Sequence, residues 1–209
     1  MTRSTPEATG LLLAGGAGRR MGTPKALLVD RDGVPRLART VDGLLEAGCT
    51  SVTVVLGAAA EVARPLLGDR EVRVVVATDW AEGMGASLRA GLRALAATAG
   101  GDAVAALVTL VDLPDVGTTV LRRVLDAWET GGGRPDALLR ATYAGRPGHP
   151  VLLGRDHWGP LIGSLEGDTG AQPYLRSRKV QEVTCDDLAT GRDLDRPDDL
   201  PGGVREGGT

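Results

Sequence analysis

The sequence predicts a single-domain α/β protein with a mostly parallel central sheet and helices on both faces. Three observations carry this prediction. Apolar, β-branched runs alternate along the chain with longer segments of helical period. The apolar runs are continuous, which is typical of strands buried on both faces. The chain has 209 residues and no break in composition, which suits one domain with a large core.

The apolar runs are the predicted strands. Four strands are predicted at residues 11–14, 51–56, 72–77 and 103–111, and three extended segments near residues 137–142, 150–153 and 180–184. Helices with apolar positions three and four residues apart are predicted at 36–47, 59–67, 84–97 and 118–129. Three of them are followed by a glycine that suits a helix C-terminus, namely Gly48, Gly68 and Gly100.

The two ends of the chain differ from the rest. Residues 1–8 and 201–209 are polar or glycine-rich, so we expect flexible ends there and a folded domain over residues 9–200.

Composition excludes several classes of partner. A net charge of −3 and a pI near 5.5 argue against a nucleic-acid or membrane-surface binder, which needs a basic face. Aromatic residues make up 2%, so base-stacking platforms are not expected. No apolar stretch is long enough to span a bilayer. Cys49 and Cys185 lack metal-type spacing and are predicted to be free packing thiols. We therefore expect a soluble, cytoplasmic protein.

The most informative motif is Leu-Ala-Gly-Gly-Ala-Gly-Arg-Arg-Met-Gly-Thr-Pro-Lys, at residues 13–25, directly after the first predicted strand. Its glycines let backbone N–H groups approach a ligand, and Arg20 and Lys25 supply positive charge for phosphate oxygens. The glycine spacing does not match the dinucleotide fingerprint, and Lys25 is followed by Ala26, not by the hydroxyl residue of a P-loop. The motif predicts a phosphate-binding loop of another kind.

Three aspartates are candidate metal ligands. Asp112 follows the predicted strand 103–111, at the sheet edge where α/β proteins bind ligands. Mg²⁺ is commonly held by one or two carboxylates together with substrate phosphates, which fits a triphosphate on the glycine loop. Asp193 and Asp195 are two residues apart, so in an extended chain both face the same side. The alternatives are a turn-capping role for Asp112 and an ordinary surface turn for Asp193 and Asp195.

The glycine loop resembles the opening loop of nucleotidyltransferases that activate sugars, isoprenoid precursors and the molybdenum cofactor. The later segments narrow this resemblance. Residues 79–92 are similar to the family element beside the nucleotide, and Gly-His-Pro-Val-Leu at 148–152 with Gly-Asp-Thr-Gly-Ala at 167–171 resemble molybdenum cofactor cytidylyltransferases. On these motifs the chain is identified as a member of the molybdenum cofactor nucleotidyltransferase family.

The resemblance implies a Rossmann-like nucleotidyltransferase fold with a short helix at residues 197–200, where Pro197 and the two acids after it suit a first turn. It also implies a reaction. NMP is transferred from an NTP to the terminal phosphate of molybdopterin or its metal-loaded form, pyrophosphate is released, and Mg²⁺ or Mn²⁺ is the cofactor. A molybdoenzyme or its chaperone is a further expected partner. Two alternatives stay open: another phosphorylated acceptor, such as a sugar or lactyl phosphate, and a nucleotide-binding or cofactor-binding carrier without catalysis.

The resemblance also implies the site residues. Arg20, Lys25 and Asp112 would be catalytic. The nucleotide would be bound by Leu13, Ala14, Gly15, Gly16, Gly18, Arg20, Lys25, Gly83, Ser87 and Asp112. The acceptor would be bound by His149, Gly167 and Asp168, and the metal by Asp112 with Asp193 or Asp195.

Two of these assignments, and the role of Trp80 beside them, keep alternatives. Trp80 either covers the base or pterin or anchors its turn on the sheet. His149 either donates to the acceptor or is a loop histidine satisfied by backbone. Gly15 leaves room for a purine where cytidylyl enzymes carry alanine, whereas the later turns favour CTP, so CTP is the prediction and GTP the alternative.

Overall fold

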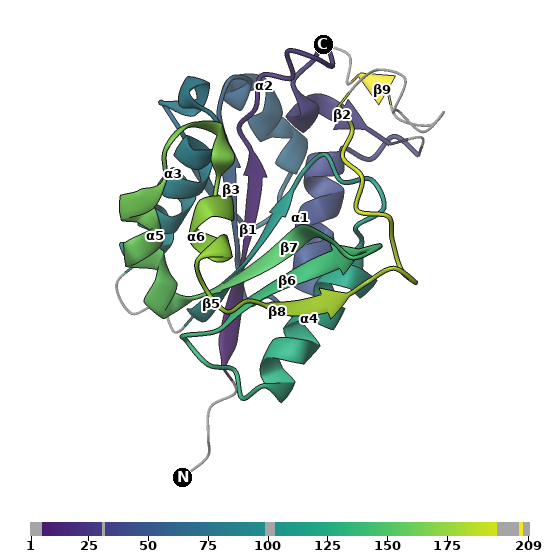
Figure 1. Ribbon diagram of the computed structural model, residues 1–209. Helices are drawn as coiled ribbons and strands as arrows, with labels where there is room; N and C mark the ends of the chain where they lie inside the picture. Colours follow the sequence, from purple (N-terminus) through teal and green to yellow (C-terminus); the bar gives the residue numbers. More distant parts are fainter. Residues whose placement is uncertain (1–5, 31, 99–102, 196–204, 207–209) are drawn as a thin grey trace.

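The protein is built on a seven-stranded sheet (Figure 1). The computed structural model describes residues 6–30, 32–98, 103–195 and 205–206. The strands, in spatial order, are β4 (Arg73–Val76), β3 (Val52–Leu56), β1 (Glu7–Ala14), β5 (Ala103–Leu110), β7 (Arg146–Gly154), β6 (Leu138–Tyr143) and β8 (Gln181–Thr184). β7 runs antiparallel to β5 and β6, and the other neighbouring pairs are parallel. The predicted mostly parallel sheet is confirmed.

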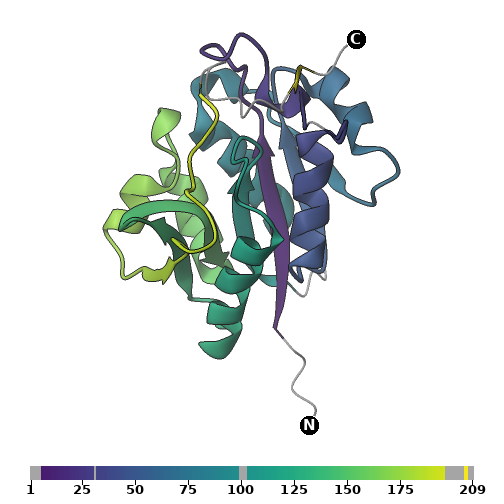
Figure 2. The same ribbon diagram turned by 90° about the vertical axis from the view of Figure 1, so that its right-hand side faces the viewer.

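Helices cover both faces of this sheet, as predicted. On one face lie α1 (Arg36–Glu46), α4 (Thr118–Thr130) and the short α2 (Ala60–Ala63), which continues as the 3₁₀ helix η2 (Arg64–Leu67). On the other lie α3 (Met84–Ala96), α5 (Trp158–Ser164) and α6 (Gln172–Arg176). In Figure 2 the purple strand β1 stands between α1, in blue, and the green helices of residues 158–176.

Alternation of side chains along the strands divides the core in two. Leu12 and Leu107 face α1 and α4, whereas Leu11 and Val108 face α3 and α5. Both cores consist mainly of aliphatic residues, as expected for strands that are buried on both faces. Cys49 and Cys185 are buried free thiols, in agreement with the sequence. No helix in the described part of the chain is long and apolar enough to cross a membrane.

The structure corrects the predicted ends and edges. Glu7 and Ala8, which we assigned to a flexible end, pair with β5 as the start of β1. Near the other end, β9 (Arg205–Glu206) pairs with β2 (Leu28–Val29). Burial on both faces does not hold for β4 and β8, because both are edge strands with exposed residues. The helix expected at 197–200 and the glycine at 100 lie outside the described residues.

The order of the strands places the loops that matter for function. The chain proceeds from β1 to β3 and β4 on one side, and β5 then takes the place on the other side of β1. Leu13 pairs with Leu110, so the loops that follow β1 and β5 leave the same edge of the sheet side by side. Such a reversal of strand order opens a crevice at the carboxyl ends of the strands, where open α/β sheets bind ligands.

Candidate active site

A cleft of about 510 Å³ lies at this reversal of strand order. It contains every residue predicted to bind the nucleotide, together with three further predicted acidic residues. The lining includes Leu13, Ala14, Gly15, Gly16, Gly18, Arg20, Lys25, Gly83, Ser87, Asp112, Asp168, Asp193 and Asp195. Segments from both halves of the chain therefore meet in one site.

The glycine loop after β1 folds back on itself. Gly18 has φ 63°, and a Cβ there would lie 1.8 Å from the carbonyl oxygen of Thr23, so only glycine fits. The N–H of Gly22 donates to the carbonyl of Gly18 at 2.8 Å and closes the turn. Lys25 then begins the 3₁₀ helix η1 (Lys25–Leu27), whose Ala26 is buried in the core. The loop thus returns Lys25 to the cleft.

The ammonium of Lys25 joins two carboxylates from distant parts of the chain. Its Nζ lies 2.7 Å from Oδ2 of Asp112 and 2.9 Å from Oδ1 of Asp195. Burial disfavours the charged form of Lys25, but the charges and hydrogen bonds of Asp112 and Asp195 outweigh it, so its pKa lies above the ordinary 10.5. Lys25 is therefore a fixed positive charge at neutral pH.

The Asp112 side chain lines the cleft, and one of its two carboxylate oxygens has no hydrogen-bond partner among the described residues. Its side chain is 13% exposed, and its Oδ1 is buried without a hydrogen-bond partner among the described residues. Its backbone carbonyl accepts the N–H of Leu194 at 2.9 Å, and Leu194 is itself buried against Met21 and Leu28. An orphaned carboxylate oxygen in such a cleft is the kind of group that a ligand completes.

Asp193 and Asp195, on either side of the buried Leu194, have different surroundings. Asp193 and Asp195 both line the cleft, as the predicted alternation requires. Asp195 shares Lys25 with Asp112, whereas Asp193 is exposed. Arg20 is 81% exposed and its Nη1 lies 3.5 Å from Oδ2 of Asp195. The geometry thus groups Asp195, and not Asp193, with Asp112.

Gly15 and Ser87 make a close contact on the other side of the cleft. A Cβ on Gly15 would lie 2.5 Å from the buried Ser87 Oγ, near the start of α3. The space that we expected Gly15 to leave for a purine is therefore occupied by the serine hydroxyl. Trp80 lines the cleft and also packs against the core beneath α3, so the anchoring contact is present, and the contact with a base or pterin stays a prediction.

The glycines before and within α3 serve packing. Gly83 has φ 120°, and a Cβ there would lie 1.9 Å from Oδ1 of Asp168. A Cβ on Gly85 would lie 2.7 Å from the carbonyl oxygen of Gly167. These glycines let the turn η5 (Gly167–Thr169) sit directly on the start of the helix. Asp168 of this turn lines the cleft, whereas Gly167, predicted to bind the acceptor, is not among the lining residues and packs on Gly85.

A second cavity of about 400 Å³ adjoins the cleft and shares Leu13, Met84 and Asp168 with it. Its wall is mainly aliphatic. Its polar side chains include Arg140, His149 and Gln172. The predicted acceptor turns therefore do border a cavity beside the nucleotide residues.

His149 is neutral in this cavity. Burial lowers its pKa to about 4, although the charge of Asp112 acts in the opposite direction. The described residues give its ring no hydrogen bond, and its backbone carbonyl accepts one from Tyr143 Oη at 2.6 Å. The structure therefore does not support the alternative in which the His149 ring is hydrogen-bonded to the backbone.

Arg140 was not predicted from the sequence. Its Nη2 donates to Oε1 of Glu182 at 2.6 Å, and its Nε is buried without a hydrogen-bond partner among the described residues. A signal for it exists, because it is the one charged residue in the extended segment 137–142. A charged side chain in an otherwise apolar strand is costly to bury without a partner, so it indicates an ion pair or a ligand at that position.

Comparison with known proteins agrees with this architecture. The sequence profile of the MobA-like NTP transferase domain matches residues 10–183. The chain is 35% identical over 205 residues to nicotine blue oxidoreductase of Paenarthrobacter nicotinovorans, covering 91% of this chain and 93% of that protein. It is 30% identical over 200 residues to a probable molybdenum cofactor guanylyltransferase of Mycobacterium ulcerans, covering 95% and 94%.

A solved structure shares both fold and sequence. The crystal structure of Rv0371c from Mycobacterium tuberculosis is 32% identical, with a TM-score of 0.77, and the match covers 94% of this chain and 96% of that one. A second structure of Rv0371c, in complex with manganese, matches with 30% identity over the same shares of the two chains and a TM-score of 0.75. The chain therefore belongs to the MobA-like NTP transferase domain family, a family of nucleotidyltransferases.

Proposed function

We propose that the protein transfers NMP from an NTP, with GTP favoured, to the terminal phosphate of a molybdopterin-type acceptor and releases pyrophosphate. The observation that carries this proposal is the Lys25 ammonium held between Asp112 and Asp195 beside the glycine loop. GTP replaces the CTP that the later turns predicted. The support for GTP is the Mycobacterium ulcerans relative, which is named a probable molybdenum cofactor guanylyltransferase.

The residues present suit this chemistry. One P–O bond forms between an acceptor phosphate oxygen and the α-phosphorus, and the bond to the departing pyrophosphate breaks. The acceptor is already an anion, so the barrier is mainly charge repulsion and needs no general base. Lys25, Arg20 and the loop N–H groups would bind the pyrophosphate oxygens as their charge grows.

The acidic residues fit a divalent cation that is bound together with the nucleotide. Among the described residues no group of three or more ligating side chains forms a ready metal cage. Asp112 and Asp195 supply two carboxylates, and Oδ1 of Asp112 lacks a partner. Mg²⁺ and Mn²⁺ accept one or two carboxylates when phosphates complete the ligand set. When bound, such an ion neutralises phosphate charge, and the Lys25 ammonium would exchange its carboxylates for phosphate oxygens.

The second cavity is the proposed acceptor site. Its aliphatic wall suits the body of a ring system, and the neutral His149 can donate and accept at the edge of that ring. Asp168 borders both cavities and so lies where donor and acceptor meet. A molybdoenzyme or its chaperone would receive the product in the cytoplasm.

The test is pyrophosphate release with each of the four NTPs, with and without molybdopterin. We expect release that needs both the acceptor and a divalent cation, and that is fastest with GTP. Because one similar protein is named nicotine blue oxidoreductase, the same preparation should be assayed for reduction of nicotine blue with a reduced nicotinamide nucleotide. Reduction of the dye without pyrophosphate release from any NTP would overturn the transferase proposal.

Asparagine variants separate the two later aspartates. We expect Asp195→Asn to raise the Mn²⁺ concentration for half-maximal activity at least about tenfold, because Asp195 lies with Asp112 around Lys25. Asp193→Asn is the matched control and should stay within about twofold of the wild type, because the Asp193 carboxylate is exposed, and the ion pairs of Lys25 among the described residues are with Asp112 and Asp195. The opposite ranking would assign the metal to Asp193.

A double-mutant cycle tests base choice at Gly15. Gly15→Ala places a methyl 2.5 Å from Ser87 Oγ, so we expect a loss of about tenfold in kcat/KM through the displaced serine. Adding Ser87→Ala should restore most of this loss, because the methyl would then meet the Cβ of residue 87 at 3.6 Å. Competition between GTP and CTP measures the change in base preference. A shift toward CTP that is equal with and without the serine hydroxyl would show that the methyl faces the base itself.

A further inference from the structure

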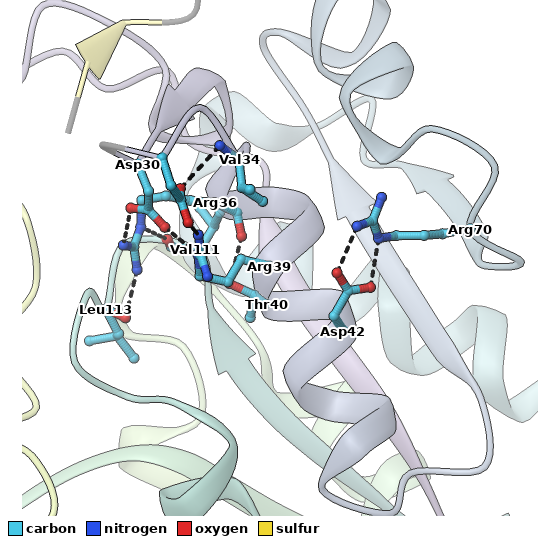
Figure 3. Close-up of polar contacts among 10 residues, drawn as sticks. Asp30, Val34, Arg36, Arg39, Thr40, Asp42, Arg70, Val111 and Leu113 are labelled. Atoms are coloured by element: carbon cyan, nitrogen blue, oxygen red, sulfur yellow. Dashed lines mark hydrogen bonds and ion pairs between the residues drawn. The ribbon is translucent and has the colours of Figure 1, made fainter. Parts of the chain in front are cut away.

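Arg36 grips the backbone on both sides of Asp112. Its Nε donates to the carbonyl oxygen of Val111 at 3.3 Å, and its Nη2 donates to that of Leu113 at 2.9 Å. Figure 3 shows this guanidinium reaching the turn from the first residue of α1. The Arg36 side chain is only 6% exposed. Arg36 does not line the cleft, so it holds the backbone beside Asp112 from the side that faces away from the cleft.

The turn that carries Asp112 depends on such outside donors. The chain leaves β5 at Leu110, and residues 111–113 belong to no helix or strand. Their three successive carbonyls are nevertheless all held. Arg36 holds the first and third, and the N–H of Leu194 holds that of Asp112 at 2.9 Å. Buried carbonyls need partners, and here the partners also fix the direction of the carboxylate between them.

Arg36 is itself locked in place. Its Nη1 donates to Oδ1 of Asp30 at 2.9 Å, and Oδ2 of Asp30 accepts Nε of Arg39 at 2.6 Å. The planar guanidinium therefore has each of its three nitrogens bonded in a different direction. A lysine at this place keeps the charge but cannot hold two carbonyls and a carboxylate in that geometry.

We propose that Arg36 is a positioning residue that aims the Asp112 carboxylate at Lys25 and at the reacting phosphates. The inference rests on the proposed function, in which Asp112 acts at the nucleotide. Arg36 touches no substrate in this scheme. It acts only by holding the backbone on either side of Asp112.

The chain offers a matched control in Arg70, an arginine that binds a carboxylate on the same helix. Arg70 makes a bidentate ion pair with Asp42 of α1, at 2.7 Å and 2.6 Å (Figure 3). Its Nη1 also donates to the carbonyl oxygen of Leu67 at 3.0 Å. It has the same kinds of bond as Arg36 but does not contact the Asp112 turn. The experiment compares Arg36→Met and Arg36→Lys with Arg70→Met and Arg70→Lys.

The first measurement needs neither substrate nor metal. The chain has two lysines, Lys25 and Lys179, and Lys179 is exposed. Acetylation of the free protein with limiting acetic anhydride, followed by mass spectrometry, gives the labelling of Lys25 relative to Lys179. In the wild type the Lys25 ammonium is held by two carboxylates and should label slowly. We expect both Arg36 variants to label Lys25 several-fold faster and both Arg70 variants to match the wild type.

The second measurement is the split between kcat and KM for pyrophosphate release. A misaimed catalytic group costs up to about a hundredfold in rate. We expect Arg36→Met to lower kcat by about a hundredfold and Arg36→Lys by about tenfold, with KM for the NTP within about twofold. The Arg70 variants should keep kcat and lose less thermal stability, because the Arg70 side chain is 30% exposed.

Each result decides the proposal. Arg36 variants that fold, label Lys25 as the wild type does and keep the kcat of their Arg70 counterparts would show that Arg36 is only structural. If neither Arg36 variant folds while both Arg70 variants do, Arg36 is required for folding and the positioning role is rejected. If the labelling changes as expected but the wild type releases no pyrophosphate with any NTP, Arg36 still positions Asp112 and the proposed function alone fails.

Discussion

Replacing Asp112 by asparagine is expected to lower kcat by about a thousandfold while leaving the fold intact. The substitution preserves the shape of the side chain and removes its charge. Lys25 would then keep only Asp195 as an anionic partner, and the buried Oδ1 position would no longer belong to a carboxylate that can bind a cation. Pyrophosphate release measured across a series of Mg²⁺ and Mn²⁺ concentrations is the assay.

Asp115 provides the matched control for this substitution. It lies three residues further along, and its Oδ1 is likewise buried without a hydrogen-bond partner among the described residues. Its Oδ2 accepts the N–H and hydroxyl of Thr190, which an asparagine oxygen can also do. Asp115→Asn should therefore keep kcat within a few-fold of the wild type. Equal losses in the two variants would mean that any charge removed from this turn harms the enzyme, and the assignment to Asp112 would be withdrawn.

Lys25→Met is expected to lower kcat by at least about a hundredfold, because the charge that meets the developing pyrophosphate is lost. A second effect should appear without nucleotide. The carboxylates of Asp112 and Asp195 would face each other without the ammonium between them, so Mn²⁺ should bind the free protein more tightly than it binds the wild type. Calorimetry with Mn²⁺ alone and pyrophosphate release with NTP and acceptor measure the two effects separately.

Stability should fall only modestly in this variant. The side chain of Asp112 is 13% exposed, but that of Asp195 is 41% exposed and can reach water, so we expect a loss of about 1–2 kcal/mol. Lys179→Met removes the other, exposed lysine and should leave both activity and metal affinity unchanged. A folded Lys25→Met protein with near-normal turnover would show that the loop does not bind a triphosphate through Lys25.

Much of the site could be predicted because its parts are local in sequence. The apolar run before the glycine loop, and the run before Asp112, each place a loop at the carboxyl end of a strand. The alternation of Asp193 and Asp195 around an apolar Leu194 required the two carboxylates to face one side, and both do line the cleft. These inferences depend on the direction of the strand and on the alternation of side chains along an extended chain. Both follow from residues that are neighbours in the sequence.

The parts that were missed depend on contacts between distant segments. No single window of sequence shows that β7 runs antiparallel, that Ser87 occupies the space beside Gly15, or that Arg140 borders the second cavity. Gly167 illustrates the limit: the turn at Gly-Asp-Thr-Gly does border the cavity, but the motif does not show which of its residues face that cavity. The direction of a side chain in an irregular turn is set by what packs against that turn.

The sequence by itself determined the fold class, the glycine loop and the set of charged residues from which the site is built. Only the tertiary structure decided how those charges are paired. Lys25 meets carboxylates that are 87 and 170 residues away, and Arg36 holds carbonyls that are 75 and 77 residues away. Charge–charge and hydrogen-bond energies depend on distances of a few ångströms and on burial, and both quantities exist only after the sheet has brought these segments together.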